Sequence, residues 1–409
     1  MYSKWNSKTR LLGLATLAAV VTLAQHPAAA APTGRPDRGA FQSTASRPGD
    51  PLPGLTTAEL AVFTLGLEEF MNVETPESGL GPIFNGVACA QCHSAPATGG
   101  GSQVRVTRFG RMVNGQFDPM TEKGGSLLQN MAIDPAVREL IPPEATVIAQ
   151  RLSTPLFGAG LIEAIPDAAI EANARQRKPD GIRGRAALID DPVSGTTRVG
   201  RFGWKAQHAS LLAFAGDAYL NEMGITNRFF PVENAPNGDQ ALLAAHDHYA
   251  DPEDAVDPQT GRSDIDGAAD FMRLLAPPAP LRITAAAAEG ERLFNQIGCA
   301  ACHLPAMRTG PSPIAALDRK SVALYSDLLL NDMGTLADGI AQADAGIREM
   351  RTAPLWGLRL RQPFLHDGRA ATVDAAIRAH DGEAALVRNR YVRLAPIQLQ
   401  QLLDFLRTL

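Results

Sequence analysis

Apolar side chains recur at helical spacing in the stretch that follows Thr56 and Thr57, either of which can cap a helix with its hydroxyl group. The apolar positions of this stretch are Leu60, Phe63, Leu67 and Phe70. Steps of three and four residues place these side chains on one face, so the pattern predicts an amphipathic helix. The helix leads directly into the segment GLGPIFNGVACAQCH.

Two further helices are predicted in the last third of the chain. Thr284 caps the stretch AAAAEGERLFNQIG, in which Gly290 and Phe294 lie four residues apart, and this stretch runs into the segment CAACH. A C-terminal amphipathic helix over residues 396–409 has its apolar positions at Leu399, Leu402, Leu403 and Leu406. We expect this part of the chain to be wholly helical.

Two β-hairpins interrupt the helical pattern between these regions. The segment GGGSQVRVTRFGRMVNGQF predicts two short strands joined at Asn114-Gly115, a dipeptide typical of tight hairpin turns. The segment GRAALIDDPVSGTTRVGRF predicts a second hairpin with its turn at residues 191–195. The predicted fold class is therefore mainly α with β-hairpin insertions.

All four cysteines of the chain lie in two copies of one short motif. The residues of the two copies are Cys89, Cys92 and His93, and Cys299, Cys302 and His303. C-x-x-C-H attaches a c-type haem, because each thiol can form a thioether with a haem vinyl group while the adjacent imidazole reaches the iron. Zinc sites and redox-active C-x-x-C pairs are the alternatives, but neither uses a histidine directly after the second cysteine. The sequence predicts two covalently bound haem c groups.

The two motifs divide the chain into two haem-bearing halves. Residues 32–55 are rich in Pro, Gly, Ser, Thr and Arg and predict a flexible linker. Consecutive prolines within residues 276–283 exclude a helix and predict a second linker. We therefore expect an N-terminal haem domain with β insertions over residues 56–275 and a cytochrome c-like haem domain over residues 284–409.

The N-terminus has the organisation of a secretory signal peptide. Basic residues precede an apolar run over residues 11–23, and a stretch of alanines follows. The run is too short to span a bilayer comfortably, so we expect cleavage near Ala30 or Ala31 to remove residues 1–31 and leave no stable membrane anchor. An uncleaved anchor is the alternative. Covalent haem attachment in bacteria takes place outside the cytoplasmic membrane, so the expected location is the periplasm.

The charge balance is mildly acidic. Residues 1–31 carry three basic and no acidic side chains, so their removal takes the formal net charge from −5 to −8. This balance predicts no nucleic-acid binding and suits a basic redox partner. Aspartates between His246 and Gly267 raise the possibility of bound calcium, but their spacing is not that of an EF-hand and favours a solvated loop.

Several segments together resemble the dihaem oxidoreductase family, whose members also carry the labels thiol oxidoreductase and peroxidase. These segments are GLGPIFNGVACAQCH, PLFGAGLIEAIP, GRFGWKAQHASL, LLLNDMGTLADG, APLWGL and FLHDGRAATVDAAI. The family is related to the bacterial dihaem cytochrome c peroxidases, the methylamine-utilisation dihaem enzymes and rubber oxygenase. The resemblance covers the chain from about Thr56 onward and implies two cytochrome c-like domains that face one another, with a haem in each.

The sixth ligand of each iron decides its function, since an iron bound on both faces transfers electrons and an iron with an open face binds peroxide or dioxygen. The segment from His366 to His380 resembles one in the peroxidases, where a methionine at the position of His380 is the distal ligand. A histidine at this position resembles the arrangement in rubber oxygenase. It implies that His303 and His380 both bind the second iron, which gives a lower reduction potential than ligation by one histidine and one methionine. Met333 and Met307 are the competing ligands. His366 is either a hydrogen-bond partner in the haem environment or a histidine that anchors a turn.

The proximal ligand of the first haem is His93, and no residue of the sequence stands out as its distal ligand. A carboxylate in an apolar pocket can move the proton when an O–O bond breaks, because burial raises its pKa toward neutrality. We expect Glu163 to parallel the distal glutamate of the peroxidases, with a surface or capping carboxylate as the alternative. Gln207 and His208 are the other nearby groups, and His208 as a sixth ligand would close the site.

Trp204 is the only tryptophan between the two haem motifs. Related enzymes place an aromatic residue between their haems as a stepping stone for electrons, and the resemblance implies this role for Trp204. Packing of a large aromatic side chain in the core is the alternative.

Taken together, the resemblance implies a periplasmic, peroxidase-like dihaem oxidoreductase. The C-terminal haem would receive electrons from a small redox protein, and the N-terminal haem would activate peroxide or dioxygen. Two alternatives stay open: a non-catalytic dihaem electron-transfer subunit with both irons six-coordinate, and a dihaem oxygenase with a wide apolar approach to its first haem. Nothing in the sequence encodes a thiol-binding site.

Overall fold

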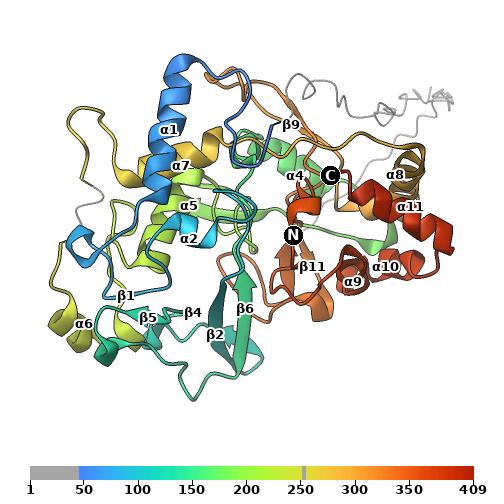
Figure 1. The fold of residues 1–409 in the computed structure, drawn as a ribbon. Helices are drawn as coiled ribbons and strands as arrows, with labels where there is room; N and C mark the ends of the chain where they lie inside the picture. The colour runs from blue at the N-terminus through green and yellow to red at the C-terminus, as the bar shows by residue number, and fades with distance from the viewer. Residues whose placement is uncertain (1–45, 251–254) are drawn as a thin grey trace, which may run out of the picture. The chain divides into compact units, whose positions relative to one another are not determined.

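The computed structural model describes residues 46–250 and 255–409 (Figure 1). The predicted signal peptide over residues 1–31 and most of the predicted linker over residues 32–55 lie outside this part of the chain. All described residues belong to one of the two units into which the chain divides. Within them, no helix combines the length and the apolar character that a bilayer-spanning segment needs.

Helices and short strands alternate along the described chain. The helices are α1 (Thr57–Met71), α2 (Cys89–Cys92), α3 (Ala159–Glu163), α4 (Asp167–Arg175), α5 (Leu211–Ala218), α6 (Gln240–His246), α7 (Asp264–Leu274), α8 (Ala285–Ile297), α9 (Val373–Arg378), α10 (Ala385–Tyr391) and α11 (Pro396–Leu406). The strands are β1 (Ile83–Phe84), β2 (Arg105–Val113), β3 (Gln116–Asp118), β4 (Leu127–Leu128), β5 (Met131–Ala132), β6 (Val147–Leu152), β7 (Ala187–Asp191), β8 (Thr196–Gly200), β9 (Met307–Arg308), β10 (Ser321–Val322), β11 (Leu330–Asp332) and β12 (Glu349–Arg351).

The predicted first helix is confirmed as α1. Thr56 is its N-cap and forms a capping box with Glu59, which satisfies backbone N–H groups of the first turn. Phe63 and Phe70 are buried, and both rings pack against Phe271 of α7, with ring centroids 5.4 and 4.7 Å apart. Leu60, which the pattern placed on the buried face, is exposed, because the contact with α7 begins one turn later.

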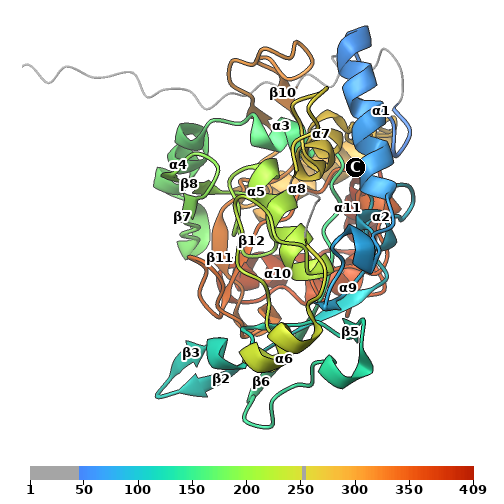
Figure 2. The same ribbon diagram turned by 90° about the vertical axis from the view of Figure 1, so that its left-hand side faces the viewer.

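Both predicted hairpins are confirmed. Strand β2 pairs antiparallel with β3, β4 and β6, and the turn between β2 and β3 is Asn114-Gly115, with positive φ at both residues. Strands β7 and β8 pair from Ala187 opposite Gly200 to Asp191 opposite Thr196. Figure 2 shows β2, β3 and β6 at one edge of the structure, apart from α1 and α8.

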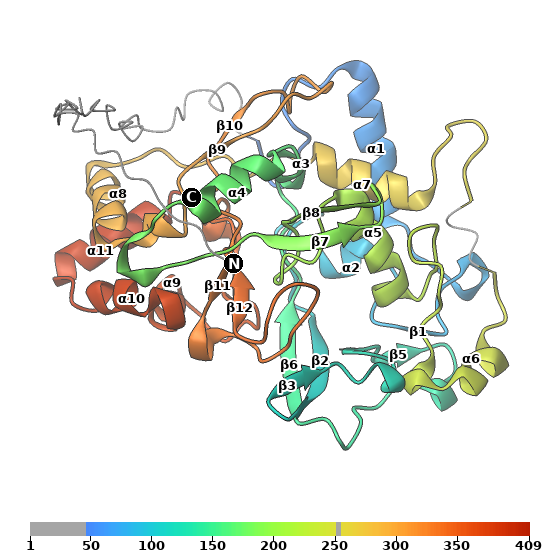
Figure 3. The same ribbon diagram turned by 180° about the vertical axis from the view of Figure 1, so that it is seen from behind.

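The predicted helices on either side of the second motif are confirmed as α8 and α11. Thr284 caps α8 by accepting a hydrogen bond from the backbone N–H of Ala287. The two helices touch at Gly290, where an added Cβ would lie 1.9 Å from the carbonyl oxygen of Gln401, so only glycine allows this approach. Figures 1 and 3 show α8, α9, α10 and α11 gathered on one side, with α1, α5 and α7 on the other.

The expectation that the C-terminal part is wholly helical is wrong. Two small antiparallel pairs, β9 with β10 and β11 with β12, lie between α8 and α9. Each strand has only two or three residues, which is too short to show an alternating pattern in the sequence.

Two hydrophobic clusters form the main core. The larger draws residues from Leu52 to Leu329, and the smaller from Ala287 to Leu409. Residues on both sides of the proline-rich segment 276–283 therefore share the larger core. The division into domains at this segment stays a prediction.

Candidate haem sites

A large cavity surrounds the second C-x-x-C-H motif, and we call it the second haem cavity. It lies among α8, α9, α10, α11 and the β11–β12 pair and contains Cys299, Cys302 and His303. It encloses about 1360 Å³ of space free of protein atoms, part of it open to solvent. This space lies directly beside the two thiols and the imidazole of His303.

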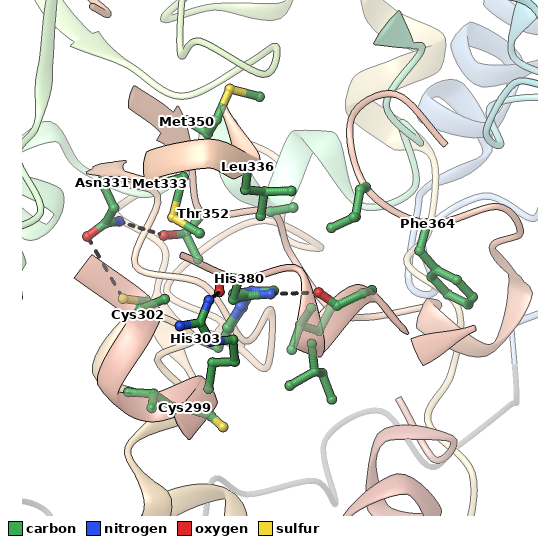
Figure 4. A pocket seen from close by; sticks show the side chains of 18 of the residues that line it. Cys299, Cys302, His303, Asn331, Met333, Leu336, Met350, Thr352, Phe364 and His380 are labelled. Atoms are coloured by element: carbon green, nitrogen blue, oxygen red, sulfur yellow. Dashed lines mark hydrogen bonds between the residues drawn. The ribbon is translucent and has the colours of Figure 1, made fainter. Parts of the chain in front are cut away.

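His303 and His380 face each other within this cavity, as Figure 4 shows. Their ring centroids lie 6.4 Å apart, at an interplanar angle of 55°. Two imidazoles that bind one metal from opposite sides at about 2 Å per bond place their ring centroids roughly 6 Å apart. The spacing therefore fits an iron held between the two rings.

Backbone carbonyl groups orient both rings. Nδ1 of His303 lies 3.1 Å from the carbonyl oxygen of Tyr325, and Nδ1 of His380 lies 2.8 Å from that of Ala376. With its proton on Nδ1, each histidine donates to a carbonyl and keeps the lone pair of Nε2 for a metal. Burial lowers the pKa of His303 to about 4 and also lowers that of His380, so both rings are neutral at pH 7.

Helix α9 sets the position of His380. Thr372 caps this helix by accepting from the backbone N–H of Ala375, and the helix ends at Arg378, two residues before His380. Arg388 of α10 donates to the carbonyl oxygen of His380 at 2.9 Å. Contacts at both ends of the segment therefore hold the imidazole toward His303.

A second cavity surrounds the first motif, and we call it the first haem cavity. It lies among α1, α2, α5, α7 and strands β2 and β6, contains Cys89, Cys92 and His93, and encloses about 1120 Å³ of atom-free space. Nδ1 of His93 lies 3.2 Å from the carbonyl oxygen of Gly100, and burial lowers the pKa of this histidine to about 4. Like His303, His93 can donate from Nδ1 to a carbonyl oxygen and keep the lone pair of Nε2 for a metal.

No second histidine lines the first haem cavity within residues 46–250 and 255–409. Two methionines do line it, Met223 and Met272, and both belong to the larger hydrophobic cluster. The first haem cavity therefore has no counterpart of the His303–His380 pair.

Charged side chains line the first haem cavity instead, and the sequence analysis missed them. They are Arg108, Arg151, Asp217 and Glu222. A turn of π-helix over Tyr219–Met223 carries Glu222 into the cavity, and such turns are frequent at functional sites. The sequence contains no signal for this turn, because the phrase NEMG at residues 221–224 has a relative, NDMG, at residues 331–334 that spans the end of strand β11 instead.

Burial and neighbouring charges set the protonation of these groups. Burial raises the pKa of Glu222 above its ordinary value, against the opposing effects of Arg108 and Asn85. Burial also favours the neutral form of Asp217, but His208 and Arg108 outweigh it and hold the pKa of that carboxyl below its ordinary value. Burial, together with the charge of Arg151, lowers the pKa of Arg108 to about 10, so the guanidinium stays charged at pH 7.

The chemistry of both cavities fits haem better than zinc. Nε of Arg108 is buried without a hydrogen-bond partner, a position suited to an anionic group such as a haem propionate. Burial raises the pKa of Cys89, Cys299 and Cys302 to about 12, which disfavours the thiolate that zinc requires. Over the described ranges, no group of three or more His, Cys, Asp or Glu side chains is placed to hold a metal ion, although the acidic loop lies partly outside those ranges.

Glu163 does not reach the first haem cavity, which corrects the expectation that it is the distal carboxylate. Its carboxylate accepts from the backbone N–H of Leu211 and from Nε of Arg273, both at 2.7 Å. The ion pair with Arg273 ties α3 to α7. Apolar neighbours in the sequence reflected the buried helix α3 and not a catalytic pocket.

The other predicted residues are divided between cavity and core. Gln207 lines the first haem cavity and lies against Gly203, where an added Cβ would be 2.1 Å from Oε1 of Gln207. His208 does not line the cavity, because its Nε2 lies 3.2 Å from the carboxylate of Asp217. Met333 lines the second haem cavity, whereas Met307 lies outside it, with its sulfur 3.6 Å from Nδ2 of Asn173.

Trp204 lines both haem cavities. Its Nε1 donates to the carbonyl oxygen of Leu152 at 2.7 Å, and the N–H of Leu152 donates to the carbonyl oxygen of His366 at the same distance. His366 lines the second haem cavity and meets Trp204 edge-on, with ring centroids 6.1 Å apart. Trp204 and this chain of hydrogen bonds therefore join the two cavities.

A family model described as "Di-haem oxidoreductase, putative peroxidase" matches residues 135–409, about two thirds of the chain. The chain belongs to this family. The match includes the second C-x-x-C-H motif, and the first motif precedes it. The family is that of the predicted resemblance, which is confirmed, and it implies two haem cofactors in this dihaem oxidoreductase.

Solved structures similar to this dihaem oxidoreductase are distant in sequence. The hydrazine synthase of Kuenenia stuttgartiensis is 14% identical, with a TM-score of 0.40, and the match covers 90% of this chain and 97% of that one. The diheme peroxidase BthA of Burkholderia thailandensis is also 14% identical, with a TM-score of 0.40 and coverage of 85% and 86%. A MauG-like protein associated with microbial copper homeostasis is 16% identical, with a TM-score of 0.32 and coverage of 62% and 89%. No curated protein matches the chain.

Proposed function

We propose that this dihaem oxidoreductase is a periplasmic, peroxidase-like enzyme with two covalently bound haem c groups. The two cysteines of each motif would bind the haem covalently, and His93 and His303 would bind the irons. Haem supplies one-electron redox chemistry and an iron that can bind peroxide or dioxygen. The acidic balance of the chain suits a small basic protein as the electron donor.

One observation carries the division of labour between the two sites. His380 lies opposite His303 in the second haem cavity, and no histidine lies opposite His93 among the residues that line the first. An iron bound on both faces suits electron transfer, and an iron with a free face suits substrate binding. Electrons would therefore enter at the second site, and peroxide or dioxygen would react at the first.

Trp204 provides the connection that this division requires. It lines both cavities, and an aromatic ring there shortens the distance that an electron crosses through saturated groups. Reduction of hydrogen peroxide to two molecules of water takes two electrons and two protons, so the first site also needs a group that handles protons.

Glu222 is our candidate for the proton transfers. It lines the first haem cavity, and its raised pKa lies closer to neutrality than that of an exposed glutamate. In this role the ionised carboxylate takes the proton from one peroxide oxygen and returns it to the departing one. Arg108, which stays charged, would stabilise the negative charge that develops on that oxygen.

The test compares Glu222→Gln with Glu163→Gln. The first variant keeps the size of the side chain but removes its base, so we expect the rate of reaction with peroxide to fall roughly 10²- to 10⁴-fold. The wild-type rate should also rise with pH through the raised pKa of Glu222, because the ionised form is the active base. Glu163→Gln alters a carboxylate outside the cavity and should leave rate and pH profile unchanged. Equal losses in both variants would refute the role of Glu222.

A dihaem electron-transfer protein is the second candidate. Met223 and Met272 line the first haem cavity, and a methionine sulfur on the iron would close that site. An oxygenase for an organic substrate has less support, because four charged residues stand among the apolar side chains of this cavity.

A further inference from the structure

The first haem cavity contains a buried phenol with a carboxylate as its hydrogen-bond partner. Tyr219, in the π-helical turn, lines the cavity together with Cys89 and His93. It is 1% exposed, and its hydroxyl group donates to Oε1 of Glu69 on α1 at 2.5 Å. The proposed peroxide chemistry uses neither residue.

The partner of an aromatic ring decides whether the ring can give up an electron and a proton together. A phenol that loses an electron becomes a strong acid, so a nearby base allows it to end as a neutral radical. Nε1 of Trp204 donates to the carbonyl oxygen of Leu152, which is too weak a base to take a proton. The guanidinium of Arg361 also lies 5.8 Å from the centre of the Trp204 ring and disfavours a positive charge there.

The surroundings of Glu69 make it a good proton acceptor. No cation forms an ion pair with Glu69 in the part of the chain that the structure describes. Burial raises the pKa of Glu69, with a further contribution from the charge of Glu74, while the hydrogen bond from Tyr219 lowers it. The proton of Tyr219 therefore has a ready destination 2.5 Å away.

Tyr391 offers a matched comparison within the same protein. Its hydroxyl group donates to Oδ1 of Asp374 at 2.7 Å, but it lines neither haem cavity. Arg378 forms an ion pair with Asp374 at 2.8 Å and is the main reason for the lowered pKa of that carboxyl group. Tyr391 thus has a weaker base as its partner and lies outside the lining of both haem cavities.

We propose that Tyr219 and Glu69 form a redox-active pair that takes up an oxidising equivalent from the first haem site when electrons from the second site are lacking. One electron passes from the Tyr219 ring to the oxidised site, and the phenol proton passes from Oη of Tyr219 to Oε1 of Glu69. The products are a neutral tyrosyl radical and a carboxylic acid. An electron from an external reductant then restores the phenol, and Glu69 returns the proton. The pair rests on the proposed function, in which hydrogen peroxide supplies the oxidant.

The test treats the fully oxidised holoprotein with hydrogen peroxide in the absence of a donor and records electron paramagnetic resonance spectra after rapid freezing. We expect a tyrosyl radical whose hyperfine splitting changes when the protein contains ring-deuterated tyrosine. The signal should be lost in Tyr219→Phe and in Glu69→Gln, which keeps a hydrogen-bond acceptor but cannot take the proton. It should persist in Tyr391→Phe. A signal that survives in Tyr219→Phe, or a haem spectrum that responds to peroxide without any tyrosyl radical, overturns the proposal.

A second oxidant separates this proposal from the proposed function. If peroxide leaves the haem absorption unchanged, the proposed function fails, and a flash-generated ruthenium(III) polypyridyl complex then serves as the one-electron oxidant of the same holoprotein. Tyrosyl formation that requires both Tyr219 and Glu69, and that slows in D₂O, supports the pair. No tyrosyl radical, or the same yield in Glu69→Gln as in the wild type, overturns it.

Discussion

The two haem cavities are built on the same C-x-x-C-H motif but differ in what faces the histidine of that motif. In the second cavity His380 lies opposite His303, with both Nδ1 atoms at backbone carbonyl oxygens. In the first cavity His93 has the same kind of carbonyl contact, but no second histidine of the described residues lines the cavity, and its charged lining residues are two arginines and two carboxylates. In the proposed function the motif would set where a haem is attached, and the residues of other segments would set what its iron can do.

Different local structures deliver those residues. A short capped helix, α9, ends two residues before His380 and leaves its ring directed at His303. A π-helical turn after α5 brings Tyr219 and Glu222 to the first cavity together. In the proposed roles, His380 would complete the second cavity as a ligand, and Tyr219 and Glu222 would handle electrons and protons in the first.

The largest effect is expected from removal of the second histidine. His380→Ala should convert the second haem from low-spin to high-spin and open it to added cyanide, because the methyl group of alanine cannot bind the iron. His366→Gln is the matched control: His366 lines the same cavity but does not pair with His303, so its variant should stay low-spin. Absorption and electron paramagnetic resonance spectra of the oxidised proteins measure the change.

A substitution at the same position sharpens the comparison further. His380→Met should remain six-coordinate, with a higher reduction potential than the wild type. If His380→Ala keeps the low-spin spectrum, then Met333 or another residue is the ligand and the comparison fails.

A smaller effect is expected from Trp204→Phe. Reduction of the first site by way of the second should slow, because the smaller ring leaves a longer gap and loses the hydrogen bond to Leu152. The reaction of peroxide with the first site should keep its rate. Stopped-flow absorption separates the two steps, and Trp356→Phe controls for the loss of a tryptophan outside both haem cavities. Equal electron-transfer rates in wild type and Trp204→Phe would remove Trp204 from the path.

The smallest effect is expected from Thr372→Ala, which removes the N-cap of α9. Loss of this hydrogen bond should lower the free energy of unfolding by about 1 kcal/mol. The second haem should remain low-spin, because the contact of the His380 ring with the carbonyl oxygen of Ala376 and the hydrogen bond from Arg388 to the carbonyl oxygen of His380 persist. Chemical denaturation followed by haem absorption measures the loss, and a fully high-spin variant would show that the cap alone holds the ligand.

Local signals in the sequence predicted part of this account well. Thr56, Thr284 and the Asn114-Gly115 turn act over a few residues, and the structure has the expected caps and hairpin. The two C-x-x-C-H motifs are equally local, and the cysteines and histidine of each line a cavity.

Segments far apart in the sequence contribute the residues that line the first cavity, so the sequence alone could not predict most of them. Arg108 lies on β2 and Glu222 in a π-helical turn more than a hundred residues later, and only the folded chain brings them together. Glu163 was a misleading candidate because an apolar context in the sequence does not distinguish a catalytic pocket from an ion pair between helices. The sequence did not predict the short strands β9 to β12, because strands of two or three residues are too short to show an alternation of apolar and polar side chains.

The most direct test of the difference between the two cavities is the spin state of each haem in the half-reduced holoprotein, with and without hydrogen peroxide. Electron paramagnetic resonance and absorption spectra of one sample report both irons. We predict a low-spin second haem whose spectrum does not change when peroxide is added, and a high-spin first haem whose spectrum does change. Two low-spin haems that stay inert to peroxide in both redox states would contradict the account and leave an electron carrier.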